Sequence, residues 1–251
     1  MVERVSFDRV ADVYDETRGL PPRVLAKAVG VLSQELEGER VLEIGVGTGR
    51  YAVPLQKSGV RVIGVDIAPK MVARGLEKGL RDVVFADGAR LPFREATFDA
   101  VTSNHVLHLV PDWRSVLGEA RRVLRDGGSY FSVFERHPET TMSDRYREIA
   151  RELGFEKPDA GLHERDFPAL LPLSRVVPVA HHEERVPAER ALDAIDRKLY
   201  AFLWRVPDDV HREVTRRMHE EFDGTMRDRS FDLEIAFWNR DRLGALAGSP
   251  C

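Results

Sequence analysis

The sequence has a single cysteine among its 251 residues, Cys251 at the end. This excludes an internal disulfide framework, a cysteine-ligated metal site and a catalytic cysteine in the core. No apolar run approaches the length of a membrane span, because charges interrupt each run within about a dozen residues. The first residues lack the basic start and apolar run of a secretory signal. We therefore expect a cytoplasmic protein with no membrane association.

The sequence also lacks an excess of positive charge. It has 38 Lys and Arg residues against 42 Asp and Glu residues, a formal net charge of -4. No overall positive field is present to attract a polyanion, which disfavours nucleic acid as a partner. Arginines alternate with acids, as in residues 148–152, and this pattern is typical of solvated helix faces.

Short β-rich runs alternate with helical patterns over most of the chain. Expected strands cover residues 40–44, 60–65, 82–86, 98–103, 130–134, 176–186 and 230–238. Expected helices cover residues 21–35, a stretch ending near Lys57, a stretch from Pro69 to Gly75 or Gly79, residues 112–124, residues 143–153 and a long charged stretch at 187–223. This rhythm predicts βαβ units, a parallel sheet and right-handed crossovers. The late helical stretches predict a cap over the carboxyl edge of the sheet.

A glycine turn follows the first expected strand, in the run V-L-E-I-G-V-G-T-G at residues 41–49. Glycines let the backbone pass close to a ligand and adopt dihedral angles closed to other residues. The spacing is G-x-G-x-G rather than the G-x-G-x-x-G that seats a pyrophosphate. Glu43, two residues before the first glycine, suits the amino group of a cationic ligand better than a diphosphate. The alternative is a turn that serves only the packing of strand against helix.

Two further acids end the next two expected strands. Asp66 lies about twenty residues past the first glycine, where an acid accepts hydrogen bonds from a ribose diol. Asp87 ends the third strand, where a carboxylate can accept from an exocyclic adenine amine. A helix cap at Asp66 and a loop aspartate before Gly88 are the structural alternatives. Because the carboxyl ends of parallel strands meet at one edge, the three acids predict a crevice for a cationic ligand with a diol and an adenine but no phosphate.

In these motifs residues 36–135 resemble the class I S-adenosylmethionine-dependent methyltransferases, in particular the type-11-like group that acts on small molecules. The motifs occur in the order found in that family. They are E-x-G-x-G-x-G at 43–49, Asp66, Asp87, L-P-F at 91–93, F-D-A-V at 98–101, V-L-H-L-V at 106–110 and R-V-L-R-D-G-G at 122–128.

The resemblance implies a Rossmann-like α/β fold. Its sheet would have seven strands in the order 3-2-1-4-5-7-6, mostly parallel with an antiparallel seventh strand, and helices on both faces. It implies one domain overall, in which residues 1–35 form an N-terminal helical segment over the cofactor and residues 36–135 form the cofactor-binding core. Residues 136–251 would supply the remaining strands, with helical cap insertions around strands five to seven.

The resemblance also implies a site for S-adenosylmethionine, which becomes S-adenosylhomocysteine when its methyl group is transferred. The implied cofactor residues are Glu43, Gly45 and Gly47 at the methionine end, Asp66 at the ribose, Asp87 at the adenine, Ile67 and Gly88 beside these acids, and Asn104 near the sulfonium. Residues 10–18 resemble a segment that many relatives fold over the cofactor, so Tyr14 and Arg18 are candidate contacts with its carboxylate or with the substrate. An ordinary exposed amphipathic segment is the alternative. No metal site is expected.

His105 and His108 are the titratable side chains nearest to the expected point of methyl transfer. Either could act as a base, although a packing role is the alternative for both and is the stronger one for His108. Methyl transfer mainly requires an aligned nucleophile and excluded water, and a base is needed only when the nucleophile must lose a proton. The run N-H-V-L at 104–107 stands where enzymes that methylate amide or base nitrogens carry Asn/Asp-Pro-Pro-Tyr. We therefore expect a small-molecule acceptor.

Two other functions fit parts of the pattern. An NAD(P)-dependent oxidoreductase would share the fold type and the position of Asp66, but its glycine spacing differs and no Tyr-x-x-x-Lys pair follows the fourth strand. A non-catalytic regulator that binds S-adenosylmethionine would share the whole cofactor site. The identity of the acceptor, its reacting atom (O, N, S or C) and the choice between monomer and homodimer stay open at this point.

Overall fold

The computed structural model describes residues 7–15, 19–138, 140–156, 161–162 and 166–247. By its internal contacts the chain forms two compact units. The first unit comprises the described residues of 1–135, 160–180 and 233–251, and the second comprises those of 136–159 and 181–232. Among the described residues, no helix is both long and apolar enough to cross a bilayer. The prediction of one domain overall, with divisions at 35 and 135, stays a prediction.

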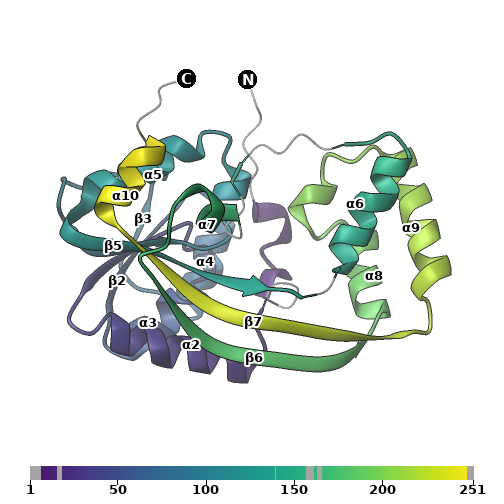
Figure 1. The fold of residues 1–251 in the computed structure, drawn as a ribbon, viewed down its shortest axis with the longest axis horizontal. Coiled ribbons are helices and arrows are strands. Elements are labelled where there is room, and N and C mark those ends of the chain that lie inside the picture. Colours follow the sequence, from purple (N-terminus) through teal and green to yellow (C-terminus); the bar gives the residue numbers. More distant parts are fainter. Residues whose placement is uncertain (1–6, 16–18, 139, 157–160, 163–165, 248–251) are drawn as a thin grey trace. The chain divides into compact units, whose positions relative to one another are not determined.

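The sheet has seven strands in the order β3-β2-β1-β4-β5-β7-β6 (Figure 1). This order is the one that the resemblance implied, so the predicted fold class is confirmed. The strands are β1 (Arg40–Ile44), β2 (Arg61–Asp66), β3 (Val83–Phe85), β4 (Phe98–Ser103), β5 (Leu124–Arg136), β6 (Arg175–Pro187) and β7 (Met226–Asn239).

The parallel pairing around β1 brings several loops to one edge of the sheet. The pairs β1–β2, β1–β4, β2–β3 and β4–β5 are all parallel. Ile44, the last residue of β1, pairs with Val65 of β2 and with Ser103 of β4. The residues that follow these three positions therefore leave the sheet at the same edge, and they include the glycine turn and Asp66.

Helices of the first unit cover both faces of the sheet. In Figure 1, α2 and α3 lie on one side of it and α5 and α10 on the other. Leu42 and Ile44 belong to a core cluster with Val116 and Leu117 of α5. Because side chains alternate along a strand, Glu43 faces away from this cluster. The helices are η1 (Phe7–Val10), α2 (Pro22–Glu35), α3 (Ala52–Lys57), α4 (Pro69–Glu77), η2 (Leu107–Leu109), α5 (Trp113–Val123), α7 (Phe167–Leu170) and α10 (Arg240–Ala247).

The second unit has a small apolar core of its own. Tyr146, Leu192, Val214 and Met218 are among its buried members. Helix α9 packs against both α6 and α8. Thr141 begins α6 with a capping box, because its hydroxyl accepts from the N–H of Asp144 and its own N–H donates to the Asp144 carboxylate. The helices of this unit are α6 (Met142–Glu152), α8 (Glu189–Asp196), η4 (Ala201–Leu203) and α9 (Asp208–Phe222).

The fifth strand begins earlier than the sequence predicts. It was expected at 130–134, several residues after the helix predicted at 112–124, but β5 starts at Leu124 directly after α5. Gly127 has φ 78°, and the pairing of β5 with β4 shifts its register between Phe98 and Ala100. Asp126-Gly127-Gly128 therefore forms an irregularity inside the strand region and does not end the helix.

The prediction of one long helical stretch at 187–223 is also wrong. Strand β6 continues to Pro187, α8 ends at Asp196, and α9 begins only after Pro207. Lys198, between these two helices, has φ 50°, a left-handed conformation that cannot continue a helix. Proline has a fixed φ and no N–H, so Pro207 suits the position before a new helix better than the interior of an old one.

Candidate functional site

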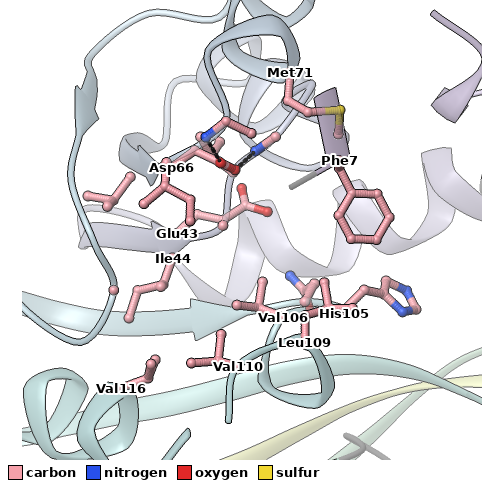
Figure 2. A pocket seen from close by; sticks show the side chains of 18 of the residues that line it. Phe7, Glu43, Ile44, Asp66, Met71, His105, Val106, Leu109, Val110 and Val116 are labelled. Carbon is pink, nitrogen blue, oxygen red and sulfur yellow. Dashed lines mark hydrogen bonds between the residues drawn. The ribbon is translucent and has the colours of Figure 1, made fainter. Parts of the chain in front are cut away.

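A cavity of about 330 Å³ lies at the carboxyl edge of the central strands, within the first unit (Figure 2). Its walls come from the glycine turn, from the ends of β1, β2 and β4, and from the N-terminal segment. The residues predicted to bind the cofactor line it together: Tyr14, Glu43, Gly45, Gly47, Asp66, Ile67, Asp87, Gly88 and Asn104. Arg18 lies outside the described residues.

The glycine turn forms one wall because its backbone adopts conformations that other residues avoid. Gly45, Gly47 and Gly49 all have positive φ, between 52° and 73°. A Cβ added to Gly45 would lie 2.2 Å from Cγ2 of Val106, which also lines the cavity. The glycines are thus required both by the turn and by the close approach of the neighbouring loop.

Asp66 binds two loops with one carboxylate. Its Oδ2 accepts from the N–H of Gly47 at 2.7 Å, and its Oδ1 accepts from the N–H of Ala68 at 2.8 Å (Figure 2). The bond to Ala68 is the local turn contact that the sequence left as an alternative to ligand binding. Each carboxylate oxygen has further lone pairs, so the turn contacts leave Asp66 able to accept from a ligand.

Glu43 is the most deeply buried acid of the cavity wall, with 4% of its surface exposed. Burial raises its pKa to about 8, although Arg50, the Asn104 side chain and the N–H of Ala52 all favour its ionised form. A cation placed beside Glu43 would restore the charge that burial suppresses. The site therefore favours a positively charged group at this end.

Arg50 is a cavity residue that the sequence analysis did not single out. It follows the last glycine of the turn, and its guanidinium carbon lies 5.6 Å from the centre of the Tyr14 ring. Its Nη2 atom is buried and has no hydrogen-bond partner among the described residues. A signal was present in the sequence, because Arg50 is the cationic residue directly after the turn.

Asp87 and its neighbours line the cavity at the end of β3. Asp87 Oδ1 accepts from the N–H of Ala89 at 3.0 Å, so the loop role considered for it exists alongside its place in the cavity wall. A Cβ on Gly88 would lie 2.7 Å from Cγ2 of Ile44, which explains a glycine there. Ile67 lines the same cavity and is 46% exposed.

The loop after β4 separates the two candidate bases. Asn104 accepts from the N–H of Val133 at 2.9 Å through Oδ1, and this fixes its amide beside the cavity. His105 lines the cavity and has φ 57°, an unusual backbone conformation for a residue with a side chain. His108 is not among the lining residues. It lies in η2, where the N–H of Leu162 donates to the carbonyl of Leu107.

The N-terminal segment, residues 7–15, contacts the cavity through two aromatic side chains. Phe7 and Tyr14 both line it, and their rings pack edge to face with centres 5.7 Å apart. Acidic side chains of this segment bind α4, the residue Lys78 that follows it, and the glycine turn. The contacts are Asp8 with the N–H of Lys70, Asp12 with the Arg74 guanidinium, and Asp15 with the Thr48 hydroxyl and Lys78.

Metal ligands do not gather in this part of the molecule. Among the described residues, no group of three or more His, Cys, Asp or Glu side chains could hold a metal ion. The charged residues that line the cavity include Glu43, Arg50, Asp66 and Asp87.

Comparison with protein families and sequences gives the following similarities. A family model described as a methyltransferase domain matches residues 42–132. The chain is 35% identical over 122 residues to an uncharacterised protein of Methanocaldococcus jannaschii, covering 49% of this chain and 57% of the relative. It is 32% identical over 155 residues to the demethylmenaquinone methyltransferase of Tropheryma whipplei, covering 57% and 63%. The chain thus spans less than two thirds of the length of either relative.

Solved structures show the same fold at low sequence identity. A Thermotoga maritima protein described as an S-adenosylmethionine-dependent methyltransferase is 18% identical, with a TM-score of 0.52 over 92% of this chain and 97% of that one. A candidate methyltransferase from Bacillus halodurans is 20% identical, with a TM-score of 0.53 over 86% and 98%. At these identities the likeness concerns the fold alone.

Proposed function

We propose that the chain is a class I S-adenosylmethionine-dependent methyltransferase, an enzyme that transfers a methyl group from this cofactor to a small molecule, and the match of residues 42–132 to a methyltransferase family model supports this. One observation carries the proposal. Glu43, Asp66 and Asp87, from the ends of three neighbouring strands, line a single cavity together with the glycine turn. The cavity therefore offers three carboxylates, and these suit a ligand with hydrogen-bond donors and positive charge better than a diphosphate.

The chemistry of these residues fits the cofactor along its length. Glu43 would hold the α-ammonium group, since a cation beside it offsets the cost of burying its charge. Asp66 would accept from the ribose hydroxyls, and Asp87 from the adenine amine. Gly45 and Gly47 would let the backbone approach the methionine part closely. When bound, the cofactor supplies a methyl group activated by a sulfonium, and S-adenosylhomocysteine is the product.

The protein's own contribution is alignment and exclusion of water. Asn104 and His105 follow β4 at the edge where the cofactor would lie, and Phe7 and Tyr14 cover the cavity from the N-terminal segment. Holding two reactants in register can lower a barrier by about 7–11 kcal/mol, so positioning alone is a sufficient catalytic device. His105 would take a proton from the acceptor where the nucleophile must lose one. His108, which is not in the cavity wall, is the weaker candidate for that role.

The acceptor would be a small molecule. The relative from Tropheryma whipplei is a demethylmenaquinone methyltransferase, which supports demethylmenaquinone-type acceptors as the first class to test. The aromatic side chains Phe7 and Tyr14 and the imidazole of His105 give the cavity flat surfaces against which an aromatic acceptor could pack. The net charge of -4 disfavours a nucleic acid in this role.

A ligand-binding experiment tests the proposal on the full chain. Thermal unfolding is followed with S-adenosylhomocysteine and, in parallel, with NAD. A ligand that binds only the folded chain stabilises it by about 2.7 kcal/mol at a hundredfold excess over Kd. At this chain length that raises Tm by roughly 2–4 °C per kcal/mol. We expect the shift with S-adenosylhomocysteine and none with NAD, and the reverse result would overturn the assignment.

Turnover is then measured with methyl-labelled S-adenosylmethionine and a panel of small acceptors that includes demethylmenaquinone analogues. Transfer of label to a member of the panel is expected. Tight binding of the cofactor without transfer to any acceptor in a broad metabolite pool would instead favour a regulator that binds the cofactor without catalysis.

A further inference from the structure

Arg50 has a buried polar atom that the fold does not use. Its Nη2 lies in the cavity wall with no hydrogen-bond partner among the described residues. A buried donor of a charged group costs free energy when it is left unpaired, and native proteins seldom leave one without a reason. A ligand in the cavity that accepts a hydrogen bond at this point would remove that cost.

The surroundings of Arg50 hold its guanidinium in place. Its carbon lies 5.6 Å from the centre of the Tyr14 ring, an arrangement in which the cation is attracted to the ring face. Burial raises the pKa of the Tyr51 hydroxyl, and the Arg50 guanidinium opposes this effect, which indicates that its charge lies close to that hydroxyl. Arg50 is therefore positioned from two sides before any ligand binds.

Glu43 gives Arg50 a neighbour of opposite charge. Of the groups that favour the ionised form of Glu43, Arg50 has the largest effect, which places the two charges close together. Both residues line the same cavity and flank the glycine turn, at positions 43 and 50. One wall thus places an acid and a cation side by side. This suits an α-amino acid, because its ammonium group favours the ionised form of Glu43 and its carboxylate can accept from Arg50.

We propose that Arg50 binds the α-carboxylate at the methionine end of the cofactor while Glu43 binds the adjacent α-ammonium. This inference rests on the proposed function and adds to it the group that recognises the carboxylate. Hydrogen bonds between a guanidinium and a carboxylate are charge-assisted and about twice as strong as neutral ones. Arg50 would therefore make the site select adenosyl amino acids over adenosine thioethers that lack the amino-acid part.

The test compares two ligands that differ only at this end. S-adenosylhomocysteine carries the amino-acid group, and 5′-methylthioadenosine keeps the adenosine and the sulfur without it. Calorimetric titration is done with the unmodified chain, Arg50→Gln and Arg50→Lys. We expect Arg50→Gln to weaken S-adenosylhomocysteine binding about 100-fold and to change methylthioadenosine binding by less than about threefold. Arg50→Lys keeps the charge but loses the planar fork, so an intermediate loss is expected.

A matched control removes the same charge elsewhere. Arg212 is an exposed residue of α9 in the second unit, and Arg212→Gln should leave both affinities unchanged. Circular dichroism of each ligand-free variant checks that it is folded. If Arg50→Gln does not fold, the test uses Arg50→Lys. The ratio of its affinities for S-adenosylhomocysteine and methylthioadenosine is then compared with the ratio for the unmodified chain.

The outcomes separate this inference from the proposed function. If the unmodified chain binds neither ligand, the proposed function fails. If it binds S-adenosylhomocysteine and the Arg50 variants bind it equally well, only the role of Arg50 is overturned. Equal losses for the two ligands would also overturn that role, since they would show general damage to the cavity.

Discussion

In the first unit, Glu43 is buried with its carboxylate toward a cavity and Arg50 has a buried donor without a partner. In the second unit, the buried His211 shares a 2.8 Å hydrogen bond with the hydroxyl of Tyr146, inside an apolar core. Both arrangements bury polar groups. In the second unit the hydrogen-bonded pair is part of a closed apolar core. In the first unit the polar groups line a cavity that a ligand can occupy. Buried polarity marks a binding site only when it faces a cavity.

The largest expected effect concerns the glycine turn, through Gly45→Ala. Its φ of 73° strains any residue with a side chain, and the new Cβ would meet Val106 at 2.2 Å. We expect a loss of about 2–5 kcal/mol in the free energy of unfolding. Binding of S-adenosylhomocysteine should be lost as well. Thermal unfolding and calorimetric titration measure the two effects.

Gly224→Ala in the second unit is the matched control. Gly224 has φ 70° but nothing within 4 Å of the position of a Cβ. The free energy of unfolding of this variant should fall by about 1–2 kcal/mol, the cost of the backbone conformation alone. Its affinity for S-adenosylhomocysteine should stay unchanged. Equal losses of stability in the two variants would show that the contact with Val106 is unimportant.

A pH effect on ligand binding should follow from Glu43. In the ligand-free chain its pKa is about 8, so the group is mostly protonated at pH 7. A cationic ammonium group favours the ionised form, and binding should release a proton below pH 8. Affinity for S-adenosylhomocysteine should therefore rise by up to tenfold per pH unit (about 1.4 kcal/mol) from pH 6 to about 8 and level off above it. Calorimetry in buffers of different ionisation enthalpy measures the released proton.

Glu43→Gln supplies the control, because its binding should show no such dependence. Without ligand, the raised pKa also has a stability consequence. Between pH 4.5 and about 8 the folded chain holds a proton that the unfolded chain has released, so the free energy of unfolding should fall as pH rises through this window. A stability curve with the same slope in Glu43→Gln would contradict the assignment of this effect to Glu43.

A stability effect without a binding effect is expected in the second unit. Tyr146→Phe removes the hydroxyl that pairs with His211 and should cost about 1–3 kcal/mol, because a buried ring nitrogen loses its partner. Affinity for S-adenosylhomocysteine should stay unchanged. The double variant Tyr146→Phe/His211→Leu should recover part of the loss, as apolar groups then replace both partners. Weaker ligand binding in Tyr146→Phe would show that the second unit contributes to the site.

The smallest expected effect concerns the N-terminal segment. The Asp12 and Arg74 side chains are 81% and 43% exposed, and ion pairs of this kind contribute little to stability. Asp12→Asn should leave Tm within error and speed amide hydrogen exchange in residues 7–15. The change should shrink at high salt, which screens the pair. Unchanged exchange at low salt would mean that the remaining contacts hold the segment alone.

Much of the first unit could be predicted because its signals are local. A helix was expected from residue 112, and the Asp112 carboxylate accepts from the N–H of Ser115 at the start of α5. The glycine turn and the strand order are likewise confirmed, since a strand, a turn and a helix N-terminus each have a sequence signal within a few residues. The placing of Glu43, Asp66 and Asp87 at one edge followed from parallel pairing.

The remainder depends on contacts that a local pattern does not contain. The break at Lys198 and Pro207 was missed because charged residues on both sides continue a helical pattern. Arg50 was missed because its significance comes from Tyr14 and Glu43, which are distant in sequence or on another element. His105 lines the cavity and His108 does not, and the positive φ of His105 is a feature that no spacing rule predicts.

The carboxylate of Asp66 has a consequence for how variants at this position are interpreted. It already fastens the backbone at Gly47 and at Ala68, so replacing it would disturb two loops at once. A loss of binding in Asp66→Ala would combine a displaced turn with any missing contact to sugar hydroxyls. Changing the ligand instead, with a 2′-deoxy analogue of S-adenosylhomocysteine, leaves both loops anchored and reports on the sugar contact alone.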